Sequence, residues 1–167
     1  MKRIAFAFLA LMSLCLSPFN SSAETLDEPT MKAKLSEILG DKTTWMVPAL
    51  KSFKRDAPCE EVKKALPALA CNSNGLSTVS LENNALLDSY EFSFDNGKLY
   101  RVTLIFKTQL DKELFKKVFT ELAEAKWGAL SPEDKKEEIY TWVNSNSDSV
   151  QSTYMVDHWE IKIVAPN

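Results

Sequence analysis

Two stretches of the chain alternate apolar and polar residues at period two, and this alternation restricts the fold more than any other feature. It predicts six half-buried strands: 77–82, 88–94, 98–106, 138–143, 149–156 and 159–164. Strands of this kind bury one face against helices and leave the other face to solvent or to a partner. The sequence therefore predicts an antiparallel sheet that is covered by helices on one side.

Segments with helical periodicity precede these strands and separate the first three from the last three. The clearest helix is 111–126, and a helix at 59–66 precedes the first three strands. Extra N-terminal helices are expected at 30–39 and 45–53, and Ser131-Pro132 has the composition that begins a short capped helix. The order helix–strand–strand–strand thus occurs twice. The predicted fold class is α+β: an antiparallel sheet of about six strands in two α-β-β-β units, packed against helices.

The turn between the second and third strands can be derived from the apolar pattern. A two-residue loop at Asn96-Gly97 would set Phe92 opposite Arg101, whereas a three-residue loop at Asp95–Gly97 sets Phe92 opposite Tyr100. Because opposed residues share a face, the apolar match favours the longer loop. In the last hairpin, Asp157-His158 as a two-residue loop sets Val156 opposite Trp159.

The chain begins with the three-part plan of a secretory signal peptide. Lys2 and Arg3 precede an apolar run at 4–16, and Ser21 and Ala23 supply the small residues that signal peptidase requires. The apolar run is too short to span a bilayer as a permanent anchor. A buried helix of the folded domain is the alternative interpretation of this segment.

Cleavage after residue 23 would divide the chain into a signal peptide, 1–23, and a single α+β domain, 24–167. This domain keeps 18 of the 20 basic residues and all 23 acidic residues, a net charge of −5, with both signs mixed along the chain. Such a balance favours neither nucleic acid nor an anionic membrane. We expect no integral membrane segment after cleavage, and a location in the periplasm of a Gram-negative bacterium or outside the cell.

Two cysteines remain in this domain, Cys59 and Cys71. An even number in an exported chain predicts a disulfide. A redox pair would more often be separated by two residues, and a zinc site needs about four ligands in a chain that has one histidine. Cys15 follows Leu14, whereas a lipoprotein signal needs a small residue there. The disulfide would tie the start of helix 59–66 to the entrance of the sheet.

The sequence carries no motif typical of a catalytic, cofactor or metal site. His158 falls at a predicted hairpin tip, without a Gly-x-Ser-x-Gly nucleophile motif in the chain. The acidic pairs Glu60-Glu61 and Glu133-Asp134 stand in predicted first helical turns, where acids stabilise the helix dipole, and Glu137-Glu138 precedes a strand. Asp95–Gly97 lacks the further acids of a calcium loop. We therefore expect no cofactor and no enzymatic activity.

The layout of the chain resembles that of small exported binding modules. A helix that opens with Pro58-Cys59-Glu60-Glu61-Val62, followed by aromatic-rich strands, is similar to the beta-lactamase-inhibitor-protein and BamE families over about residues 58–164. Residues 30–56 have no counterpart in this layout. The resemblance implies an exported α+β protein that works by binding proteins, and it assigns no functional residue.

The aromatic residues and the polar strand faces suggest where a partner would bind. Tryptophan and tyrosine at strand period are usually core, although they also supply much of the energy of protein interfaces. The other face of strand 98–106 carries Leu99, Arg101, Thr103 and Ile105, and is more apolar than a solvated face needs. These four residues are the candidate interface of a module that binds another envelope or secreted protein. The alternatives are a carrier of a small apolar ligand and a hydrolase.

Overall fold

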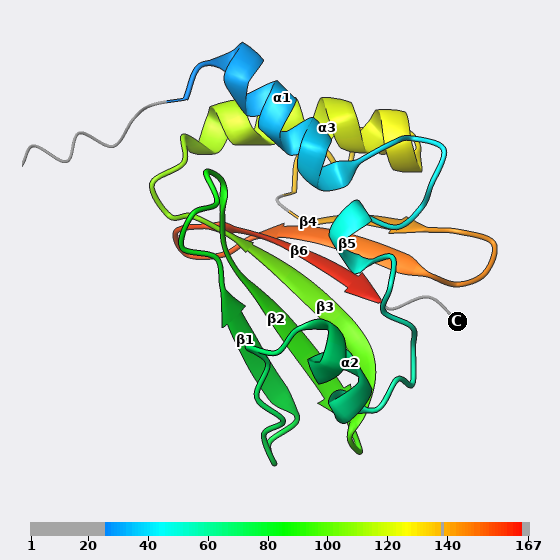
Figure 1. The fold of residues 1–167 in the computed structure, drawn as a ribbon. Helices are drawn as coiled ribbons and strands as arrows, with labels where there is room; N and C mark the ends of the chain where they lie inside the picture. Colours follow the sequence, from blue (N-terminus) through cyan, green and yellow to red (C-terminus); the bar gives the residue numbers. More distant parts are fainter. Residues whose placement is uncertain (1–25, 138, 165–167) are drawn as a thin grey trace, which may run out of the picture.

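The computed structural model describes residues 26–137 and 139–164, which form a six-stranded antiparallel sheet with helices packed against it (Figure 1). The predicted α+β class is confirmed. The predicted signal peptide, residues 1–23, lies outside the described residues. The helical elements are α1 Glu28–Leu39, η1 Pro48–Leu50 (a 3-10 turn), α2 Cys59–Ala65 and α3 Lys112–Trp127. The strands are β1 Leu76–Ser80, β2 Leu87–Asp95, β3 Lys98–Phe106, β4 Ile139–Val143, β5 Ser149–Tyr154 and β6 Trp159–Val164.

The sheet consists of two three-stranded meanders that meet at β3 and β6. Its strand order is β1-β2-β3-β6-β5-β4, with α2 before the first meander and α3 before the second. The predicted α-β-β-β order therefore occurs twice. The third strand of each unit lies at the centre of the sheet, and the first strand of each unit, β1 or β4, forms an edge.

Local capping signals account for the two long helices. The Asp27 carboxylate accepts a hydrogen bond from the Thr30 N–H at 2.9 Å, and Asp111 accepts one from Leu114 at 2.8 Å. Each bond satisfies a backbone donor that has no partner within the first turn of a helix. The two helices pack against each other over the sheet (Figure 1).

The helix expected at 45–53 is not formed; only η1 is helical there. Four of its residues are buried, Met46, Val47, Leu50 and Phe53, and the last three of them are three residues apart. The Leu50 N–H bonds to the Val47 carbonyl, and the Phe53 N–H bonds to the Leu50 carbonyl, both at 3.0 Å. The three-residue spacing of these backbone bonds matches the 3-10 turn rather than the α-helix. Met46, Leu50 and Phe53 are buried as the helical pattern implied, whereas Ala49 of the same pattern is exposed.

The short helix expected from Ser131 is also not formed. Its capping interaction is present, because the Asp134 N–H donates to the Ser131 hydroxyl at 3.1 Å. The following residues up to Glu137 are exposed and form turns. A first helical turn is costly to form, and here no apolar stripe packs on the sheet to stabilise it.

The β2–β3 hairpin combines a two-residue turn with a bulge. Asp95 pairs with Lys98 across Asn96-Gly97, whose φ angles of 49° and 76° are both positive, as a tight hairpin turn requires. An irregularity in the register between Ser93 and Phe94 then makes Tyr100 the extra residue of β3. The predicted three-residue loop was therefore wrong.

The pairing beyond this bulge also differs from the prediction. Phe92 lies opposite Val102, and Tyr90 lies opposite Leu104. The bulge thus sets apolar residues of β2 and β3 opposite each other, which the predicted three-residue loop was assumed to do.

The last hairpin has a longer loop than predicted. Tyr154 pairs with Trp159, and the Met155 N–H donates to the His158 carbonyl at 2.8 Å. Val156, expected opposite Trp159, is 97% exposed in the loop. A two-residue turn needs residues with positive φ, which are absent from 155–158. The slip of two residues keeps the side chains of β5 and β6 on their predicted faces, whereas Val156 leaves the strand.

Aromatic rings fill the space between α3 and the sheet. The Phe115 ring of α3 lies 4.7 Å from that of Phe106 on β3 and 5.5 Å from that of Trp159 on β6, between ring centroids. Trp127 and Trp142 contact each other at 5.4 Å, and each donates its indole N–H to a backbone carbonyl. These aromatic residues therefore belong to the core.

Candidate functional site

The candidate site is the sheet face that points away from the helices, called the open face below. The other face, called the helical face, carries eight residues that are almost fully buried: Phe92, Val102, Leu104, Phe106, Trp142, Trp159, Ile161 and Ile163. Phe115 and Phe119 of α3 contact Phe106 and Trp142 on that face. Because side chains alternate between faces along a strand, their neighbours form the open face.

Cross-strand pairing arranges the open-face side chains in rows. One row crosses all six strands through Thr78, Glu91, Thr103, Lys162, Gln151 and Thr141. The row beside it contains Ser80, Ser89, Ile105, Glu160, Thr153 and Ile139. Both rows are mainly polar, and charges of opposite sign meet near their centre.

The charged groups at this centre form a linked series on β6 and its loop. Glu160 lies between Lys162, whose Nζ is 3.1 Å from Oε2, and His158, whose Nε2 is 3.3 Å from Oε1. His158 Nδ1 lies 2.7 Å from the Asp157 carboxylate. Burial lowers the pKa of His158, but the bonds and charges of the two acids outweigh it and raise that pKa above its ordinary value.

Two polar atoms of β3 are buried in the open face and have no hydrogen-bond partner among the described residues. They are the Thr103 hydroxyl, on a residue that is 2% exposed, and the Arg101 Nε. The Arg101 Nη2 donates to the Ser93 hydroxyl at 3.4 Å, and its Cζ lies 5.4 Å from the Tyr100 ring centroid. Buried polar groups are rarely left unpaired, and each of these atoms could accept or donate a hydrogen bond to a further group. The Ser152 hydroxyl and the Trp159 Nε1 on the helical face are unpaired within the described residues as well.

The structure brings together three of the four residues predicted as an interface. Arg101, Thr103 and Ile105 share the open face, with Arg101 and Ile105 partly exposed. Leu99 was predicted on the same face because the alternation was assumed to be unbroken. That prediction was wrong, since Leu99 is 0% exposed and belongs to the core. The bulge at Tyr100 shifts the phase of β3 and turns Leu99 toward the helical face.

Sequence reasoning missed Tyr100, Glu160 and Lys162 as members of the site. Tyr100 was assigned to the core by the same unbroken alternation, yet it is 40% exposed. Glu160 and Lys162 alternate with the apolar residues of β6, so the period-two pattern already placed them away from the core. The signal that was missing is the pairing of β6 with β3, which brings them beside Thr103 and Ile105.

The groups considered for catalysis do not converge. Glu60 and Glu61 are exposed in the first turn of α2, Glu133 and Asp134 lie in an exposed turn, and His158 is in the β5–β6 loop. Glu138 lies outside the described residues. No cluster of three or more histidine, cysteine or acidic residues that could hold a metal ion occurs within 26–137 and 139–164.

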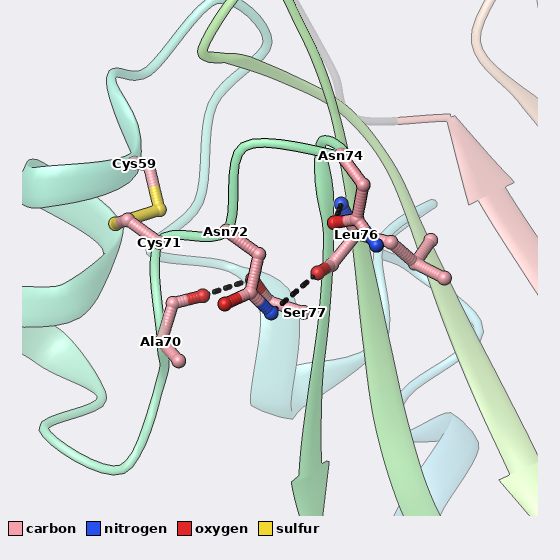
Figure 2. Close-up of a disulfide and its surroundings, with 7 residues drawn as sticks. All are labelled: Cys59, Ala70, Cys71, Asn72, Asn74, Leu76 and Ser77. Atoms are coloured by element: carbon pink, nitrogen blue, oxygen red, sulfur yellow. Dashed lines mark hydrogen bonds between the residues drawn. A yellow bond between two sulfur atoms is a disulfide. The ribbon is translucent and has the colours of Figure 1, made fainter.

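The Cys59–Cys71 disulfide closes one end of the helical face. The two sulfur atoms are 2.06 Å apart, as predicted for this pair. Figure 2 shows how the segment beyond the disulfide joins β1: the Asn72 side chain donates to the Leu76 carbonyl at 2.9 Å, and the Ser77 hydroxyl donates to the Ala70 carbonyl. The disulfide therefore holds α2 at the start of the sheet.

In the described part of the chain, no helix is long and apolar enough to cross a membrane. Comparison with family models, with curated proteins and with solved structures gives no match to this chain.

Proposed function

We propose that this chain is an exported protein-binding module, and that the open face of its sheet recognises another envelope or secreted protein. The observation that carries the proposal is the centre of that face. There the Thr103 hydroxyl and the Arg101 Nε are buried without partners in the isolated chain. A buried polar group without a partner costs about 1–3 kcal/mol, which a partner's donors and acceptors would recover.

The side chains around this centre have the composition of a binding surface. Tyr100 is 40% exposed beside the Arg101 guanidinium, and tyrosine and arginine are enriched among residues that dominate binding energies. Glu160 and Lys162 lie next to them with opposite charges. Mixed charges favour a partner of complementary pattern over a uniformly charged polymer or membrane.

The disulfide supports the proposed compartment. Disulfides persist in oxidising environments such as the periplasm and the cell exterior, and are rare in the cytosol. Residues 1–23 would direct the chain there as a signal peptide. The proposal places the partner in the same compartment.

The aromatic residues favour this function over that of an apolar-ligand carrier. A carrier would use aromatic side chains between helices and sheet to line a pocket. Here the Phe115 ring contacts both Phe106 and Trp159 in that space. The open face offers the more accessible recognition surface.

The test is affinity capture of the chain from residue 24 onward, expressed with a C-terminal tag in its native host. Arg101→Glu should abolish recovery of a specific partner, because it reverses a charge at the centre of the open face. Lys63→Glu is the matched control, since Lys63 is an exposed cation on α2. Equal recovery of the partner by both folded variants would refute the proposal.

A further inference from the structure

The edge strand β4 has an unusual combination of exposure and composition. Among the described residues it pairs only with β5. On the open face, Ile139 and Val143 are 48% and 62% exposed, and Thr141 between them is exposed as well. Natural edge strands usually carry a charge, a proline or a bulge that prevents pairing with another chain. Residues 139–143 contain none of these.

The sequence of β4 is also nearly symmetric about its centre. It reads Ile139-Tyr140-Thr141-Trp142-Val143, with β-branched residues at the ends, aromatic residues inside them and threonine in the middle. If two copies paired antiparallel about Thr141, Ile139 would face Val143 and Tyr140 would face Trp142. Pairs of β-branched and of aromatic residues are the ones that stabilise antiparallel strands. A two-fold interface requires this kind of self-complementarity.

The other edge of the sheet lacks this property. In β1, the same operation about Thr78 would set the apolar Leu76 opposite the polar Ser80. Leu76 and Ser80 are both exposed, so the mismatch would lie on the surface of the pair. Self-pairing is therefore favoured at β4 and not at β1.

The surface beside β4 suits a second copy as well. A groove between α3 and the β4 edge includes Tyr140 and is lined by three lysines and three glutamates: Glu113, Lys116, Lys117, Glu121, Glu124 and Lys135. Because the two signs are equal in number, a second copy would bring no net repulsion. A strongly charged partner would gain nothing from this balance.

We propose that β4 is a dimerisation edge, at which two copies of this chain pair their β4 strands antiparallel, with the two Thr141 residues opposite each other across the two-fold axis. The two sheets then form one continuous sheet. The two-fold axis is perpendicular to that sheet, so the two open faces lie on the same side. This assembly is independent of the function proposed above, because Arg101 and Thr103 take no part in it.

The first test uses cysteine crosslinking of the chain from residue 24 onward. Directly opposed residues of antiparallel strands have Cα atoms about 4.5–5.5 Å apart, within the range of a disulfide. Thr141→Cys should therefore give a covalent dimer under mild oxidation, whereas Thr78→Cys on β1, which is also exposed, should stay monomeric. Failure of Thr141→Cys to crosslink, or equal crosslinking of both variants, would overturn the proposal.

The second test uses introduced charges to establish which residues of the two β4 strands lie opposite each other. The double variant Ile139→Lys with Val143→Lys places like charges opposite each other in both pairs, and should raise the dimer dissociation constant at least about tenfold. Ile139→Glu with Val143→Lys places opposite charges there and should retain the dimer. Sedimentation over a micromolar concentration series measures both, and circular dichroism checks that each variant folds. A wild type that is monomeric throughout, or a Glu/Lys variant as weakly associated as the double lysine variant, contradicts the proposal.

Discussion

The two faces of this sheet are formed by the same strands and differ in composition and packing. On the helical face, side chains such as Phe106 and Trp159 are buried and pack against α3. On the open face, the central residues Arg101, Thr103, Glu160 and Lys162 are polar or charged. In the described part of the chain, buried polar atoms without a partner occur on both faces, including the Thr103 hydroxyl and the Trp159 Nε1. We expect stability to depend mainly on the helical face, and the open face is the surface that we propose for binding. Substitutions can separate these two roles.

The largest effect is expected at the centre of the aromatic core. Phe115→Ala should lower the free energy of unfolding by about 3–5 kcal/mol, because it removes a buried ring that contacts both α3 and the sheet. Ile105→Thr, on the open face, should cost less than about 1 kcal/mol. Urea unfolding of both variants measures the contrast. Similar losses would mean that the open face contributes to stability as much as the helical face does.

A second comparison tests the bulge that separates the faces in β3. Leu99→Ala should cost about 2–5 kcal/mol, since Leu99 is fully buried. Tyr100→Ala should cost less than about 1 kcal/mol, because Tyr100 is exposed on the bulge. An unbulged strand would produce the reverse order in the same unfolding assay.

The disulfide should stabilise the helical face without contributing to recognition. Replacing Cys59 and Cys71 together by serine should cost about 3 kcal/mol, because the loop they close, with a sequence separation of 12, becomes unrestrained in the unfolded chain. Thermal unfolding with and without reductant measures this cost. Partner binding at a temperature where the variant is folded should be unchanged; loss of binding there would assign the disulfide end to the recognition site.

The smallest effect concerns His158 beside the open face. Its raised pKa means that protonation stabilises the folded chain, fully below the ordinary pKa of about 6.5 and no longer once the pH rises above the folded pKa. His158→Gln should therefore cost a few tenths of a kcal/mol at pH about 5.5, as is typical of exposed ion pairs, and nothing at pH about 8.5. A cost that grows with pH would contradict the assigned contacts to Asp157 and Glu160.

Much of the fold could be predicted because its signals are local. The period-two alternation located all six strands, and the helical apolar stripe located α3. The bulge at Tyr100 could not be found in this way, because it depends on how β3 pairs with β2. Two positive-φ residues at Asn96-Gly97 require a tight turn, and only an extra residue in β3 then restores the apolar pairing.

The candidate site was predictable to a smaller extent, since it is assembled from separate strands. Alternation alone placed Arg101, Thr103 and Ile105 on one face. The approach of Glu160 and Lys162 to them follows from the pairing of β6 with β3, two strands more than fifty residues apart in the chain. The absence of hydrogen-bond partners for Thr103 is a property of the packed sheet, and no sequence pattern encodes it.

The most direct test of the account is site-specific photocrosslinking in the native host. A benzophenone amino acid in place of Ile105 lies on the open face, and the same amino acid in place of Lys63 lies on exposed α2. Our account predicts that the Ile105 probe forms an adduct with one specific exported protein and that the Lys63 probe does not. An adduct from Lys63 together with none from Ile105 would contradict the account, because recognition would then use the side of the molecule that carries α2.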